Sequence, residues 1–196
     1  MSDVDTDETT VRRAVVLDYL PHGLSDDGRP QYQKSPAGYA LGLEDFQLYE
    51  IAFDPDERVT IGNRVVVDPA DERDVVDECH TVAYEGLTSG AQSELEYVVG
   101  DLVEEDEERF VDFYNEAQPI TLRLHQLNLL PGIGKKLRNG ILDERKRKPF
   151  ESFEELEERV SGLHDPDDVL VQRILEELRD DDLKYRTFVG RRDQQA

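Results

Sequence analysis

The sequence has few of the residues that cross-link chains or span membranes. Its 196 residues include a single cysteine, Cys79, which excludes an internal disulfide framework and favours a reducing compartment. No apolar run approaches the roughly 20 residues of a membrane-spanning helix. The first ten residues are acidic and do not resemble a signal peptide. These absences predict a cytoplasmic protein without membrane contact.

Positive charge is also scarce. The chain has 46 acidic residues against 23 basic ones, only six of them lysines, and a formal net charge of −23. The acids are spread along the chain, which is typical of a protein from a halophilic cytoplasm. At molar salt the Debye length falls to about 3 Å, so long-range repulsion is screened and local contacts decide binding. The net charge therefore indicates habitat and does not exclude a polyanionic partner.

The pattern along the chain predicts an α+β protein with a β-rich N-terminal part. Residues 1–10 are expected to form a disordered acidic tail. Short apolar runs alternate with turn-rich pieces over residues 11–87, which predicts about five strands closing into a small OB-like β-barrel. Residues 88–117 follow as a helical connector, with Ser89 and Gln92 as its capping-box pair.

The C-terminal part is predicted to be all-α. Residues 118–184 contain two helix–short hairpin–helix units in tandem, the second a degraded copy of the first. Ile120, Leu124 and Leu127 are spaced for one face of the first helix. Residues 185–196 are a C-terminal tail that could add one edge strand.

Aromatic residues in the barrel segment allow two interpretations. Stacking on an open sheet face beside cations is how OB-like barrels bind single strands. The alternative, that these rings fill the core, is favoured. The residues concerned are Tyr32, Tyr39, Phe46 and Tyr49, with Lys34 and Arg64 nearby in sequence.

The stretch "LNLLPGIGKKLRNGILDERKRK", residues 127–148, differs from its surroundings. Gly132 and Gly134 allow a tight turn and close approach of a ligand to the backbone, with Ile133 as a core plug between them. Amide groups at the start of the following helix then form an anion site suited to a phosphate. The stretch resembles the helix–hairpin–helix motif, which implies binding of a nucleic-acid backbone.

The charge distribution supports this prediction. Residues 132–148 hold seven basic and two acidic side chains, a net of +5, so the rest of the chain carries −28. Two alternatives stay open: a hairpin used only for packing, and a module that docks an acidic protein through charge. The predicted nucleic-acid-binding residues are Gly132, Ile133, Gly134, Lys135, Lys136, Arg138, Arg145, Lys146, Arg147 and Lys148.

Signals for catalysis are weak. The four histidines are scattered, and no phosphate-binding P-loop, nucleophile elbow or zinc finger is present. Some DNA glycosylases carry a catalytic aspartate downstream of this hairpin, near the place where this chain has Phe150 and Glu151. The sequence therefore predicts a non-enzyme with no catalytic residues, metal or cofactor.

The order of parts, with "PFESFEELEERVSGL" and "DPDDVLVQRILEEL" near the end, is similar to an archaeal family of unknown function described as nucleic-acid-binding. The resemblance covers about residues 11–188 and the acidic composition adds a haloarchaeal character. It implies RNA or DNA binding, with RNA favoured because the usual gene neighbours are translation and transcription components. Ribosomal or transcription proteins are the further partners it implies. The hairpin itself contacts phosphate and does not separate RNA from DNA.

Overall fold

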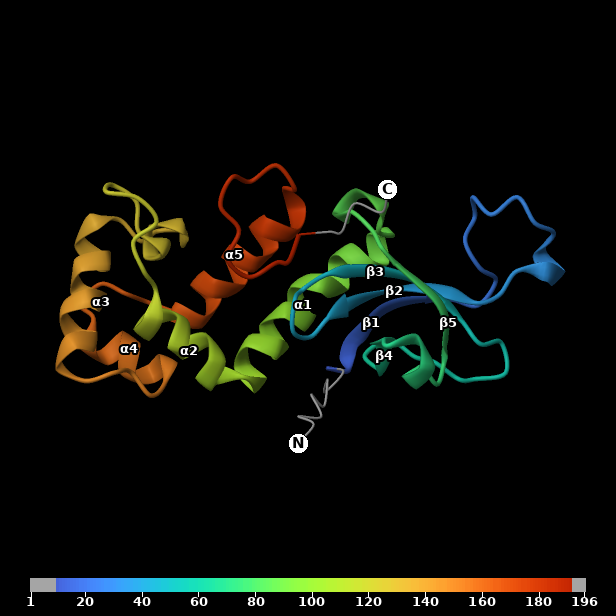
Figure 1. Ribbon diagram of the computed structural model, residues 1–196, viewed down its shortest axis with the longest axis horizontal. Coiled ribbons are helices and arrows are strands. Elements are labelled where there is room, and N and C mark those ends of the chain that lie inside the picture. Colours follow the sequence, from blue (N-terminus) through green and yellow to red (C-terminus); the bar gives the residue numbers. More distant parts are fainter. Residues whose placement is uncertain (1–9, 192–196) are drawn as a thin grey trace, which may run out of the picture. The chain divides into compact units, whose positions relative to one another are not determined.

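The computed structural model describes residues 10–191 (Figure 1). The predicted acidic tail lies outside this range except for its last residue, and so do residues 192–196. The chain forms two compact units, one with the described residues up to Glu94 and Arg191, the other covering Leu95–Gly190. A mixed α+β architecture follows, as predicted, with the sheet in the first unit.

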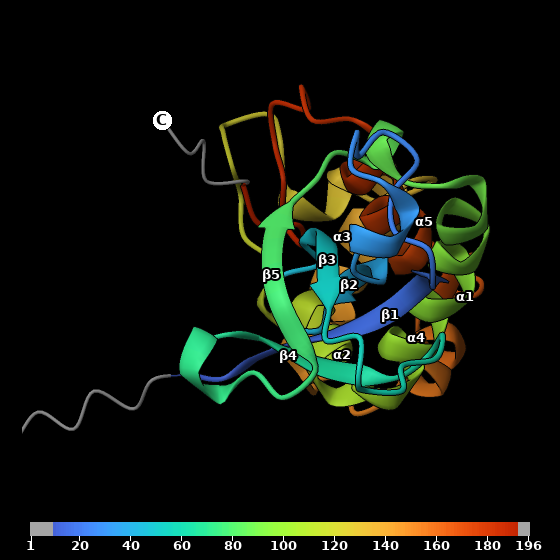
Figure 2. The same cartoon turned by 90° about the vertical axis from the view of Figure 1, so that its right-hand side faces the viewer.

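The first unit is built on a curled antiparallel sheet (Figure 2). Its strand order is β4-β1-β2-β3-β5, and Val15 of β1 pairs with Leu41 of β2. A register shift between Val16 and Asp18 marks a bulge in β1, which increases local twist and helps the sheet to curl. The strands are β1 (Arg12–Leu20), β2 (Ala37–Gly42), β3 (Leu48–Phe53), β4 (Arg64–Asp68) and β5 (Val76–Thr81), with 3₁₀ turns η1 (Gln31–Gln33), η2 (Ala70–Glu72) and η3 (Tyr84–Gly86).

The five predicted strands are present, but the predicted closed barrel is not. Within residues 10–191 the sheet is a half-barrel whose two ends are β4 and β5. Closing the sheet into a barrel would bury little apolar surface at the β5 edge, because Val76 is the only buried residue of β5. The segment "RVTIG" before β4 forms a turn, with Asn63 Oδ1 accepting from the Thr60 amide at 2.9 Å. Gly62 in this turn has a positive φ of 87°.

Aromatic side chains of the sheet lie in its interior. Tyr39, Phe46 and Tyr49 are all buried, which confirms the core interpretation for these three. Tyr32 is different, with 84% of its surface exposed in the loop between β1 and β2. The sheet therefore does not present the row of exposed rings that base stacking would require.

The residues predicted as a helical connector are helical, but the capping residue is not the predicted Ser89. Helix α1 (Ser89–Glu105) and α2 (Glu107–Glu116) are separated by Asp106. The capping side chain belongs to Thr88, whose Oγ1 accepts the Ala91 amide at 3.1 Å. The remaining elements are η4 (Gln126–Leu129), α3 (Lys135–Arg147), α4 (Phe153–Arg159) and α5 (Pro166–Arg179).

The helix predicted before the first hairpin is absent from the described residues. Residues 119–125 form a closed loop instead, and a short 3₁₀ turn follows it. Thr121 Oγ1 accepts the amides of Arg123 and Leu124 at 3.2 and 3.0 Å. Threonine competes in this way with helical hydrogen bonding, and Pro119 supplies no donor of its own. These local contacts override the helical spacing of the apolar residues.

Two turns with the same geometry occur in the second unit, one at 130–133 and the other at 160–163. Each closes with a hydrogen bond from the amide of its fourth residue to the carbonyl of its first, at 3.2 and 3.1 Å. The third residue has a positive φ, 78° at Gly132 and 88° at Gly162, as a type II turn requires. The first and fourth side chains are buried in both turns. The predicted repeat is therefore present at the level of the turns.

The C-terminal segment packs on α5 and forms no strand among the described residues. Glu177 is completely buried (0% exposed) and accepts the amides of Thr187, Phe188 and Val189 at 2.8, 2.9 and 3.0 Å. Arg173 Nε donates to the same carboxylate at 3.0 Å. One buried carboxylate thus anchors the end of the unit.

Candidate nucleic-acid interface

The two glycines of the "PGIG" turn differ in backbone conformation. Gly132 has a φ of 78°, which strains any side-chain-bearing residue. Gly134 has ordinary extended angles, φ −86° and ψ −170°. A Cβ atom at Gly134 would meet no atom within 4 Å. The fold therefore requires glycine at Gly132, whereas neither backbone nor packing requires it at Gly134.

Helix α3 begins at Lys135, and its N-cap residue, Gly134, provides no side-chain cap. The first four amides of an α-helix have no intrahelical acceptor, and Gly134 has no side chain to accept from them. Helix α4 shows the usual solution, since Ser152 Oγ accepts the Glu155 amide at 3.1 Å. The first turn of α3 also contains no acid and has exposed Lys135 and Lys136 instead. Cations at this end oppose the helix dipole, so the arrangement is one that an anion would stabilise.

Asn128 connects the turn to α3. Its Nδ2 donates to the Ile133 carbonyl at 3.1 Å, and its Oδ1 accepts from Arg138 at 3.1 Å. Arg138 is also hydrogen-bonded to Asn139 Oδ1, at 3.3 Å from its Nε. These contacts hold the half-buried guanidinium beside the turn. Asn128 was not among the predicted residues, although it is the only polar residue in "LNLLPGIG".

The predicted basic cluster is divided by the fold. Arg145 donates to a backbone carbonyl of α2 at 3.0 Å, and burial lowers the pKa of its guanidinium. Arg147 pairs with Glu144 at 3.1 Å and Lys148 with Glu151 at 3.4 Å. These residues lie about 17–21 Å along the helix from Gly134, given a rise of about 1.5 Å per residue. The group beside the turn is Gly132, Ile133, Gly134, Lys135, Lys136 and Arg138, and the group at the far end of α3 is Arg145, Lys146, Arg147 and Lys148.

An open depression lies beside the turn within the second unit. It is lined by residues 128–134 together with Arg173 and Glu176. The Glu176 carboxylate lies 2.9 Å from Arg173 Nη1, so its charge is paired. The depression therefore places the glycine turn next to a neutralised acid on an open surface.

His125 is buried at the base of the loop before the turn, 6% exposed, as expected for a packed histidine. Its Nδ1 accepts the Leu127 amide at 3.2 Å. Burial lowers the pKa of His125 from its ordinary 6.5, and the positive charges of Arg145 and Arg138 lower it further. The imidazole is therefore neutral in the folded protein near pH 7.

The lowered pKa of His125 predicts a pH-dependent stability. Below about pH 6.5 the unfolded chain binds a proton at this residue that the folded chain does not, so the free energy of unfolding should fall as pH decreases. His125→Asn retains a capping acceptor and should reduce this dependence in urea titrations at pH 7.5 and 5.5. His164→Asn, at an exposed histidine, is the matched control. Equal slopes for the wild type and His125→Asn would contradict the assignment.

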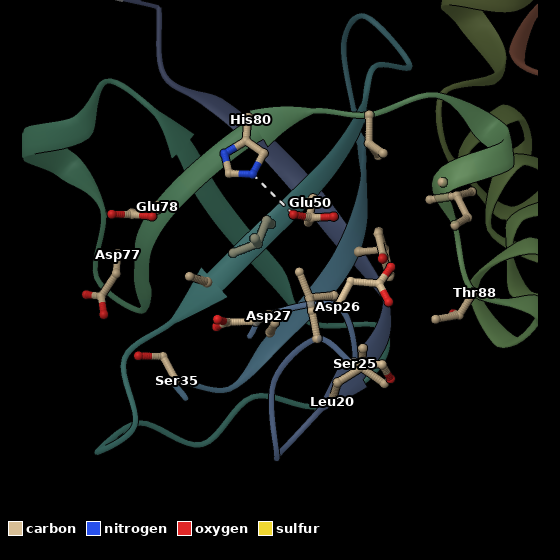
Figure 3. A pocket seen from close by; sticks show the side chains of 18 of the residues that line it. Leu20, Ser25, Asp26, Asp27, Ser35, Glu50, Asp77, Glu78, His80 and Thr88 are labelled. Atoms are coloured by element: carbon tan, nitrogen blue, oxygen red, sulfur yellow. Dashed lines mark hydrogen bonds and ion pairs between the residues drawn. The ribbon is translucent and has the colours of Figure 1, made fainter. Parts of the chain in front are cut away.

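The first unit contains a cavity of about 780 Å³ between β2, β3, β5 and the loop before η1 (Figure 3). Arg29 lies 2.8 Å from Asp27, and its hydrogen bond lowers the pKa of that carboxyl. His80 Nε2 lies 3.2 Å from Glu50. The carboxylates that line the cavity are Asp26, Asp27, Glu50, Asp77 and Glu78. Five acids against these two basic side chains make the cavity unfavourable for phosphate.

The described residues lack the features of a metal site or a reactive thiol. Residues 10–191 contain no group of three or more His, Cys, Asp or Glu side chains placed to hold a metal ion. Cys79 is isolated, and burial raises the pKa of its thiol to about 11. None of the helices in this range combines the length and apolar content needed to cross a lipid bilayer.

Comparisons with known proteins place the chain in a family. The family described as "Protein of unknown function (DUF655)" matches residues 10–190. The uncharacterized protein MJ0038 of Methanocaldococcus jannaschii is 43% identical over 178 residues, which cover 90% of this chain and 78% of that protein. The crystal structure of Af1531 from Archaeoglobus fulgidus, of the same family, is similar with a TM-score of 0.82 and 40% identity. It covers 91% of this chain and 99% of that one. The chain belongs to the DUF655 family, which has archaeal members.

Proposed function

We propose that the second unit binds the phosphate backbone of a nucleic acid through the turn at 130–133 and the start of α3. The observation that carries this proposal is the helix start itself. It has no cap and no acid but two exposed lysines, in a chain of net charge −23. A phosphate oxygen would accept the unused amides, and the lysines would neutralise its charge.

The resemblance to a helix–hairpin–helix motif is part of this proposal. The glycine turn and the following helix agree with the motif, whereas a 3₁₀ turn stands in place of its first helix. The second turn is unsuited to phosphate, because α5 has Asp167 and Asp168 in its first turn. In the same way, "OB-like" stays a proposal for the curled sheet, whose acidic cavity makes it a poor phosphate site.

RNA is the proposed ligand in preference to DNA, and the cytoplasm of a haloarchaeon is the proposed setting. The family resemblance favours RNA through its association with translation and transcription, so ribosomal or transcription components are the further partners proposed. The proposed role is binding without catalysis, in line with the weak catalytic signals in the sequence. The alternative, a module that docks an acidic protein, would use the same cations without using the backbone amides.

The salt dependence of binding tests the proposal. Each neutralised phosphate contributes a slope of about −0.9 to log K against log[salt] for duplex DNA and about −0.7 for single strands. Lys135→Gln/Lys136→Gln should therefore reduce the slope by roughly 1.4 to 1.8 and weaken binding to every sequence alike. Fluorescence anisotropy with labelled structured RNA, single-stranded RNA and duplex DNA over a KCl series measures this.

Arg147→Gln/Lys148→Gln is the matched control, since it removes the same charge from residues that are already paired with acids. We expect a smaller change of slope for this variant. Circular dichroism should confirm folding at each KCl concentration. A folded wild type that binds none of the three ligands would contradict the proposal and direct attention to an acidic protein partner.

A further inference from the structure

Leu122 is an apolar side chain placed entirely in solvent. Its exposed fraction is 107%, and Thr121 and Arg123 on either side are exposed as well. Fully burying a leucine side chain is favourable, so a leucine at such a position forgoes a stabilisation that the fold could have used. The three residues form the tip of the loop at 119–125.

The loop that presents Leu122 is held by its own hydrogen bonds. The amides of Ile120 and Thr121 both donate to the Leu124 carbonyl, at 2.8 and 3.0 Å. At the base, a bridge joins Pro119 to His125. A side chain on such a loop is held in position before binding, which lowers the entropic cost of a contact.

The loop leads directly into the proposed phosphate site. Gln126 donates its amide to the Gln118 carbonyl at 2.9 Å, and the chain then passes through η4 to the turn at 130–133. In Figures 1 and 2 the yellow loop between α2 and α3 projects from the helices of this unit. Arg138 and Arg145 of α3 are near enough to His125, at the base of the loop, to lower its pKa.

We propose that Leu122 packs against the face of an unstacked base beside the phosphate held by α3, so that the preferred ligand is structured RNA interrupted by a bulge. This inference rests on the proposed function. The apolar surface of a nucleic acid is provided mainly by its base faces, and aliphatic side chains inserted at base steps are a known means of unstacking them. Sequence-specific and structure-specific RNA recognition is directed mostly at bulges and loops, where bases are already unstacked.

The test compares an RNA hairpin that contains a one-nucleotide bulge with the same hairpin fully paired. The wild type should bind the bulged RNA roughly tenfold more tightly, the order expected for burying one leucine side chain. Leu122→Ala should lose this preference while binding the paired RNA as the wild type does. Leu122→Met should retain it, because the volume and apolar character are kept. Ile61→Ala, at an exposed aliphatic residue of the first unit, should behave as the wild type.

A 2-aminopurine placed next to the bulge gives a second readout. Its fluorescence should rise when the wild type or Leu122→Met binds and should not rise with Leu122→Ala. Equal affinity of the wild type for the two RNAs, or an unchanged preference in Leu122→Ala, would overturn the role of Leu122 and leave backbone binding intact. Absence of binding to either RNA by the folded wild type would instead overturn the proposed function.

Discussion

Gly134→Asp should strongly weaken nucleic-acid binding while leaving the protein at least as stable as the wild type. The angles at Gly134 suit a capping residue, and a Cβ atom there has open space. An aspartate would accept the free amides of α3 and oppose the helix dipole, contributing about 0.3–1 kcal/mol. The same carboxylate would occupy the phosphate position and repel the ligand. We expect affinity to fall by about 100-fold, the order of a lost charge-assisted contact.

Gly134→Ser distinguishes the contribution of the α3 amides to binding from the contribution of the net charge. Serine competes for the same amides but leaves the net charge unchanged, so nucleic-acid binding should weaken while docking of an acidic protein should not. Anisotropy titrations and thermal unfolding of both variants measure binding and stability independently. Wild-type affinity in a folded Gly134→Asp protein would show that the amides of α3 do not contact the ligand. Gly132 is less suitable for this test, because its φ of 78° makes any substitution destabilising.

Glu177→Ala should cause the largest loss of stability. The substitution would leave Arg173 buried without this partner and remove the acceptor for three backbone amides. Breaking a buried ion pair from one side costs about 3–5 kcal/mol, most of it from the charge left behind. Urea unfolding in high KCl should therefore show a large decrease in the transition midpoint.

Glu176→Ala is the matched control for this prediction. Glu176 also pairs with Arg173, at 2.9 Å, but 53% of its side chain is exposed. Ion pairs at such positions contribute about 0–1 kcal/mol, so the midpoint should change little. A similar midpoint for the two variants would mean that Glu177 does not anchor the C-terminal segment.

Local features of the site were predictable because they depend on neighbouring residues. The turn is specified by Gly132, which follows a proline and can adopt a positive φ. The buried side chain of the turn is specified by Ile133, which lies between two glycines. The cap at Ser152 was predictable for the same reason, since Glu155 follows at the capping-box spacing. The basic cluster was correctly located in the sequence, but charge counting could not show that Arg145 donates to a distant carbonyl.

Features that depend on tertiary contacts were not predictable from the pattern. Ile120, Leu124 and Leu127 have helical spacing, yet only Leu127 is fully buried, because hydrogen bonds of Thr121 close a loop. Whether a curled sheet closes depends on pairing between strands far apart in sequence, and β5 buries too little to provide it. The role of Glu177 was hidden for a similar reason, since its partners lie up to 12 residues away.

The two turns of the second unit share their backbone geometry but are followed by residues of opposite charge. Both keep a glycine at the third position and buried side chains at the first and fourth. The helices that follow the two turns differ in the charge of their first turn, with lysines at the start of α3 and aspartates at the start of α5. The turn geometry thus constrains the same positions in both turns and leaves the charge of the residues beyond them unconstrained. The second turn can therefore serve packing alone, since the cations follow the first.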